Sequence, residues 1–102
     1  FHTRFIDRVR VRGRKEAVLI YEVYDWEPAE RIALRQSLKA DWSEALNLYY
    51  GREFVPAFRL LRGLREKEPQ DRVAELYLRR AAALIRRGIP KGWEGVEVID
   101  LK

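Results

Sequence analysis

Residues 5–12 alternate between apolar and polar positions, as a β-strand does, and they form the first half of a predicted β-hairpin. A turn is expected at Gly13, and residues 17–24 that follow are β-branched and aromatic on both faces. A lone two-stranded ribbon is marginal, so the second strand is expected to be covered on both sides by a partner sheet or another chain. In the first strand, two faces are predicted, one with Phe5, Val9 and Val11 and the other with Arg8, Arg10 and Arg12.

After Pro28 the apolar spacing changes to the three- and four-residue steps of helices. We predict one long helix over about residues 28–50, with room for a bend at Ala40–Asp41 and an end at Gly51. A second helix is predicted over residues 54–67, because Ala57, Leu61 and Leu64 fall on one face of it. Pro56 is tolerated there, since it lies in the first turn. Pro69 then ends the helical run.

A third helix is predicted from Asp71, which is a good N-cap, to Arg87. The glycine and proline that follow are a stop signal. Residues 91–102 are expected to form a short extended tail anchored by Trp93. The predicted class is therefore α+β and mainly α, with an N-terminal hairpin, three antiparallel helices and a tail.

The apolar stripes of the helices predict a core rich in aromatic and small side chains. At helical spacing such side chains usually pack against one another, although a ligand groove between helices is the alternative. The residues expected to make the helical packing or interaction surface are Trp42, Ala45, Tyr49, Phe54, Ala57, Leu61, Leu64, Pro69 and Tyr77.

Composition removes much chemistry from consideration. The 102 residues contain no Cys and one His, which excludes disulfides and thiolate metal sites and leaves the serines without a histidine base beyond His2 near the terminus. We therefore predict no catalytic residues and no metal site. The sequence begins Phe-His-Thr and contains no Met, so we expect it to be a piece of a longer protein.

The net charge of +5 raises the question of anionic partners. Residues 1–24 hold six basic against three acidic residues, or +3, concentrated in the hairpin. These arginines can be a solvated or partner-facing strand face, can contact phosphates, or can bind nucleic acid. The arginine face lacks interleaved aromatic residues for base stacking, so nucleic-acid binding is not favoured.

One stretch resembles a tetratricopeptide repeat. Its second helix and exit turn have an aromatic residue, a small residue three positions later, two large apolar residues and a terminal proline. A small residue, Ala45, takes the matching place on the preceding helix, and residues 72–87 would begin an unfinished second repeat. The residues at these offsets are Phe54, Ala57, Leu61, Leu64 and Pro69.

The order of features along nearly the whole chain is similar to the carboxy-terminal end of bacterial class III adenylate/guanylate cyclases that carry a tetratricopeptide-like extension. The features are the basic hairpin Val9-Arg10-Val11-Arg12-Gly13-Arg14, the strand Val18-Leu19-Ile20-Tyr21-Glu22-Val23, Leu48-Tyr49, Arg52-Glu53-Phe54-x-x-Ala57, Pro69-x-Asp71 and Trp93-x-Gly95-Val96.

This resemblance implies that residues 1–25 are the last two strands of a cyclase domain and residues 26–102 a helical domain with the Trp93 tail. It also implies that Arg12, with Arg14 beside it, contacts nucleotide phosphates in the parent enzyme. The parent would use Mg or Mn with ATP or GTP, and its metal-binding aspartates would lie upstream, so this chain would hold no cofactor.

The resemblance finally implies a non-catalytic interaction or regulatory module in the cytoplasm, without membrane contact. Its helices would bind a protein partner or a second protomer, which allows a homodimer, and would act on the cyclase through the linker Asp25–Pro28. The alternative is a stand-alone small basic module that binds nucleic acid through the arginine-rich hairpin.

Overall fold

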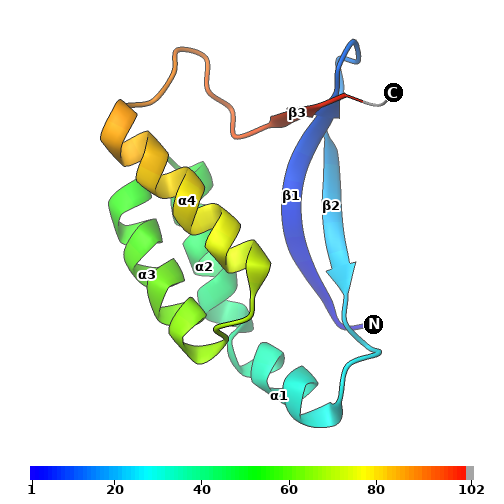
Figure 1. Ribbon diagram of the computed structural model, residues 1–102. Coiled ribbons are helices and arrows are strands. Elements are labelled where there is room, and N and C mark those ends of the chain that lie inside the picture. The colour runs from blue at the N-terminus through cyan, green and yellow to red at the C-terminus, as the bar shows by residue number, and fades with distance from the viewer. Residues whose placement is uncertain (101–102) are drawn as a thin grey trace. The chain divides into compact units, whose positions relative to one another are not determined.

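A computed structural model describes residues 1–100 and shows two compact units (Figure 1). One unit joins Phe1–Leu34 to the segment from Trp93 onward and contains all three described strands, and the other spans Arg35–Gly92. The α+β class, with an N-terminal hairpin and mainly helical content, is confirmed. The division into cyclase-type strands over residues 1–25 and a helical domain over residues 26–102 stays a prediction. The compact units themselves divide after Leu34 and after Gly92.

The sheet has the order β2-β1-β3. Strand β1 (Thr3–Val11) pairs antiparallel with β2 (Val18–Val23) and parallel with the short β3 (Glu97–Ile99) (Figure 1). The predicted extended tail is therefore an edge strand of the same sheet, with Val9 opposite Glu97 and Val11 opposite Ile99.

A β-bulge at Ile6 changes which side chains share a face of β1. Phe5 is opposite Tyr21 and Asp7 is opposite Ile20, so one extra residue lies between these pairs. Because adjacent residues of β2 point to opposite faces, Phe5 and Asp7 do too. The prediction that Phe5 shares a face with Val9 is therefore wrong. Phe5 instead meets Tyr21 edge to face, with ring centroids 5.6 Å apart.

The predicted long helix is two helices, which gives four helices among the described residues instead of three. They are α1 (Ala29–Ser37) and α2 (Lys39–Tyr50), separated at Leu38, whose φ and ψ are −98° and 0°. The Leu38 N–H bonds the carbonyl of Arg35, a three-residue step that tightens the end of α1, and α2 restarts when Trp42 N–H bonds the Leu38 carbonyl. No proline or glycine marks this break.

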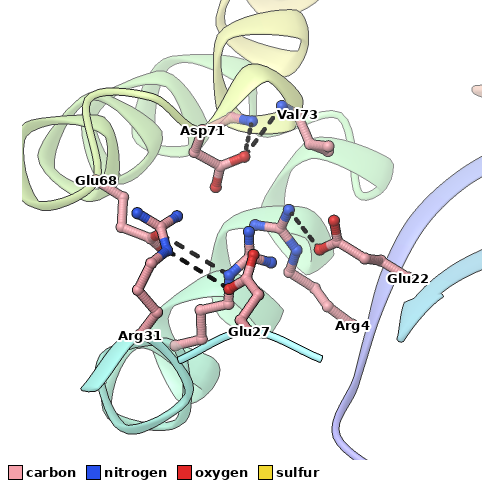
Figure 2. Close-up of polar contacts among 9 residues, drawn as sticks. Arg4, Glu22, Glu27, Arg31, Glu68, Asp71 and Val73 are labelled. Carbon is pink, nitrogen blue, oxygen red and sulfur yellow. Dashed lines mark hydrogen bonds and ion pairs between the residues drawn. The ribbon is translucent and has the colours of Figure 1, made fainter. Parts of the chain in front are cut away.

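The other two predicted helices are confirmed as α3 (Phe54–Lys67) and α4 (Arg72–Arg87). Asp71 caps α4 as predicted, because its Oδ1 accepts the N–H groups of Val73 at 3.0 Å and Ala74 at 3.3 Å (Figure 2). At the other end Gly88 takes a φ of 86°, a conformation that favours glycine.

The core of the helical unit lies among α2, α3 and α4. Side chains that the periodicity placed in the core are buried in all three helices, and Pro69 is exposed in the turn after α3. Tetratricopeptide packing itself stays a prediction. The buried members of the predicted set are Trp42, Ala45, Tyr49, Phe54, Ala57, Leu61, Leu64 and Tyr77.

Shortening Leu61 should destabilise the helical unit strongly. Leu61 is fully buried, so Leu61→Ala leaves a cavity that costs roughly 2–5 kcal/mol of unfolding free energy. Ala57→Leu, which overpacks a fully buried position, should cost about 1–3 kcal/mol. Urea unfolding measures both values. Val55→Ala is the matched control, because Val55 lies on the same helix and is 46% exposed. Unchanged stability of Leu61→Ala would contradict this core.

Candidate interaction site

The outer strand β2 is apolar and exposed on both faces. Within residues 1–100 it is an edge strand, because its only strand neighbour is β1. The register puts Leu19, Tyr21 and Val23 on one face of the sheet and Val18 and Ile20 on the other. Their exposed fractions run from 38% for Ile20 to 56% for Tyr21. The described chain therefore does not supply the cover that we predicted for this strand.

Such an edge can accept another strand through its backbone while its side chains are covered by a partner. Exposed apolar edge strands pair readily with other chains, and proteins normally shield them with charge, prolines or covering elements. In β2 the charged residue is Glu22, whose Oε1 lies 3.1 Å from a guanidinium nitrogen of Arg4 on β1 (Figure 2). This geometry suits strand addition by a protein partner.

The hairpin turn contains Arg12 and Arg14, whose predicted contact with nucleotide phosphates stays a prediction. The Arg14 N–H bonds the Val11 carbonyl at 2.9 Å, and Gly13 between them has a φ of 89°. Arg12 is also bound to the tail: its N–H bonds the Ile99 carbonyl at 2.8 Å, and its guanidinium pairs with the carboxylate of Asp100. A phosphate at Arg12 would therefore compete with Asp100.

The tail also changes how the charge is distributed between the units. The sheet unit, residues 1–34 with 93–102, holds eight basic and nine acidic residues, a net charge of −1. Residues 35–92 hold 13 basic and seven acidic residues, a net charge of +6. The hairpin arginines are thus balanced within their own unit, and the excess positive charge of the chain belongs to the helices.

A polar clasp closes the open end of the hairpin. The carboxylate of Asp25 accepts the backbone N–H of His2 at 2.8 Å and lies 2.5 Å from His2 Nδ1. The Tyr24 N–H bonds the His2 carbonyl, and the rings of His2 and Tyr24 lie 5.7 Å apart. The hydrogen bond from the His2 side chain, with that from its backbone, lowers the pKa of Asp25.

The linker that follows is ordered by local bonds. The Glu27 N–H bonds the Tyr24 carbonyl at 3.2 Å, and the Glu27 carboxylate lies 3.5 Å from Nε of Arg31 one turn later (Figure 2). Asp25–Pro28 is therefore held at both ends within the sheet unit.

Eight of the nine helical residues predicted for packing are buried, as core side chains are. Tyr77 is fully buried and its hydroxyl lies 2.6 Å from that of Tyr50. Trp93 is half-buried in the sheet unit.

Within residues 1–100 no three His, Cys, Asp or Glu side chains are grouped to hold a metal ion. No helix in this range combines the length and apolar character needed to cross a bilayer.

Sequence reasoning missed three polar residues that organise these units. They are His2, Asp100 and Glu68, which neither the periodicity nor the motifs single out. Glu68 is in fact buried, and its carboxylate lies 3.9 Å from Nε of the equally buried Arg35. Each partner is more than 20 residues away in the sequence, so local spacing carried no signal of the pairing.

Comparison with known proteins finds one relevant similarity. Over 86 residues the chain is 29% identical to an adenylate cyclase of Dictyostelium discoideum described as terminal-differentiation specific. The match covers 84% of this chain and 4% of that protein, so the chain spans a small part of this relative. No family model and no solved structure matches the chain. The chain is therefore similar to part of an adenylate cyclase.

The clasp should make the sheet unit sensitive to acid. The pKa of Asp25 is lowered in the folded state, so its stabilising effect is present above about pH 4 and is lost as the pH falls through the folded pKa. An NMR titration should place the Asp25 midpoint below that of an unfolded peptide. Asp25→Asn should flatten the pH dependence of stability below about pH 4. An Asp25 midpoint at or above the peptide value would contradict the clasp.

Proposed function

We propose that this chain is a non-catalytic regulatory and protein-interaction region of a class III adenylate or guanylate cyclase, acting in cyclic-nucleotide signalling in the cytoplasm. The observation that carries the proposal is the exposed, doubly apolar strand β2 in a chain that is similar to part of an adenylate cyclase. In this proposal β2 continues a catalytic-domain sheet, and the helical unit binds a protein partner or a second protomer.

The position of the linker supports a regulatory role. The Asp25 clasp and the Glu27–Arg31 pair fix the backbone between β2 and α1. A segment held in this way can pass a displacement of the helices to the strand, whereas a flexible linker would absorb it. Partner binding at the helices would then bias the catalytic domain through this segment.

The proposal gives this chain no chemical step. The parent would use Mg or Mn with ATP or GTP, and the carboxylates of residues 1–100 do not offer a metal site. Arg12, with Arg14 in the same turn, is the proposed phosphate contact in the parent. Asp100 would then act as an internal competitor for the Arg12 guanidinium.

The first test reads the coding sequence upstream of Phe1 and measures cyclase activity of the full-length protein. A catalytic domain with paired metal-binding aspartates is expected there. Its absence would end the proposal and favour a stand-alone module.

A charge on β2 should disrupt the proposed sheet continuation. Leu19 is 52% exposed in this chain, so Leu19→Lys is tolerated here but buries an unpaired ammonium once a partner covers the strand. We expect cyclase activity of the full-length protein to fall about tenfold or more. Val55→Lys adds the same charge at an exposed site on α3 and should stay within about twofold of the parent. Equal activity of both variants would contradict covering of β2.

Arg12→Ala should raise the KM for the nucleoside triphosphate in the full-length protein. Loss of one charge-assisted contact predicts about a tenfold increase. Asp100→Ala should leave the KM unchanged or lower it, because it removes the competing carboxylate. Lys15→Ala is the control for charge in the same turn. If Arg12→Ala leaves the kinetics unchanged, Arg12 does not contact the phosphates and its role is that of a solvated or structural side chain.

A further inference from the structure

Helix α4 carries a straight stripe of three exposed arginines, Arg72, Arg79 and Arg86. They follow one another at seven residues, which is two helical turns, so they lie on one face about 10.5 Å apart. This face is opposite the buried residues of α4, which include Tyr77 and Ala81. Within residues 1–100 the structure records no ion pair for the three arginines.

The stripe belongs to the unit that holds the excess charge. Residues 35–92 have a net charge of +6, and ten of their 13 basic residues are arginines. A guanidinium binds a carboxylate through two parallel hydrogen bonds, which an ammonium does not do. An anionic partner with carboxylates at matching intervals would therefore be recognised by position as well as by charge.

The other side chains of this face favour a protein over a nucleic acid or a lipid surface. Glu75 lies between Arg72 and Arg79 and would repel phosphates of duplex DNA, which carry one charge per ~1.7 Å. Carboxylates ~10.5 Å apart can each lie opposite an arginine and avoid Glu75. The aromatic residue of α4, Tyr77, is buried and cannot stack on bases. Ala82 and Ala83 beside the stripe give little apolar surface for insertion into a bilayer.

We infer that the α4 stripe is a docking surface for an acidic helical segment of a partner protein, with carboxylates at a seven-residue period. Such a helix, lying along α4, presents one carboxylate every ~10.5 Å, the interval of the arginines. The small side chains of Ala82 and Ala83 allow the two helices to approach closely. The inference rests on the proposed role of the helical unit as an interaction module and adds the chemistry of its partner.

The test titrates the 102-residue chain with a designed peptide and follows backbone NMR signals at low salt. The probe is an alanine-rich helix of about 22 residues with glutamates at positions 4, 11 and 18, long enough to be helical. The control peptide has the same composition, with its glutamates distributed around the helix. We expect the probe to shift signals of α4 selectively, and the control peptide to shift them much less.

Variants of the chain then test the residues. Replacing Arg72, Arg79 and Arg86 by Gln should weaken peptide binding about tenfold, as the sum of three exposed ion pairs. The matched control replaces Arg59, Arg62 and Lys67 by Gln, which removes the same charge from exposed positions of α3, and should change binding less than about twofold. Unchanged melting temperatures would show that both variants remain folded.

Three results would overturn the inference. They are no signal shift at about 1 mM probe, equal shifts with both peptides, and stripe-dependent binding that is tighter for a DNA duplex or phosphatidylserine vesicles than for the probe. None of these results changes the expected effect of Leu19→Lys on cyclase activity, which is measured separately. The stripe can therefore fail while the proposed function stands, and a full-length protein without a cyclase domain would remove the proposed function alone.

Discussion

The helical unit depends on the burial of Tyr77. This side chain of α4 has its ring centroid 6.0 Å from that of Trp42 and 5.0 Å from that of Tyr49, both on α2, in edge-to-face geometry. Its hydroxyl bonds that of Tyr50, so the polar end of a fully buried ring is satisfied. Fully buried alanines on α2, α3 and α4 allow close approach of the helices around it. These contacts turn the inner faces of all three helices into core and leave their outer faces for charge.

A different constraint acts on the sheet unit, because its sheet has three strands among the described residues and two of them pair on one side alone. The central strand β1 has a partner on each side, because the tail returns to pair with it as β3. Return of the tail also brings Asp100 to Arg12 and balances the charge of the hairpin. Because β3 pairs with β1 and not with β2, the outer edge and both faces of β2 stay exposed within residues 1–100. Among the strands of residues 1–100, β2 is thus the one that combines a free edge with two exposed apolar faces.

Local patterns in the sequence predicted those features whose cause is local. The bounds of α3 and α4 followed from spacing and caps, because Asp71 and Gly88 act on their own helix ends. The break at Leu38 was missed, since the apolar residues keep their three- and four-residue steps across it and no proline or glycine separates α1 from α2. The bulge at Ile6 was missed because alternation looks the same with one residue inserted. The pairs of Arg12 with Asp100 and of His2 with Asp25 depend on the chain returning to itself, which spacing cannot reveal. For the candidate site, the sequence identified the apolar character of β2 but could not show that the chain leaves it uncovered.

The separation of charge between the units changes what the basic character of the chain means. In the sequence the arginines of the hairpin stand out, because six basic residues fall within the first 24. In the structure the tail places Glu94, Glu97 and Asp100 in the same unit, and Asp100 pairs with Arg12. The helical unit keeps an excess of positive charge, because it has seven acidic against 13 basic residues and two of the seven, Glu68 and Asp71, serve in an ion pair and a helix cap. The excess positive charge therefore belongs to the helical unit, whereas β2 in the sheet unit carries five exposed apolar side chains. The two units thus present chemically different surfaces, an apolar edge strand in the sheet unit and exposed arginines in the helical unit.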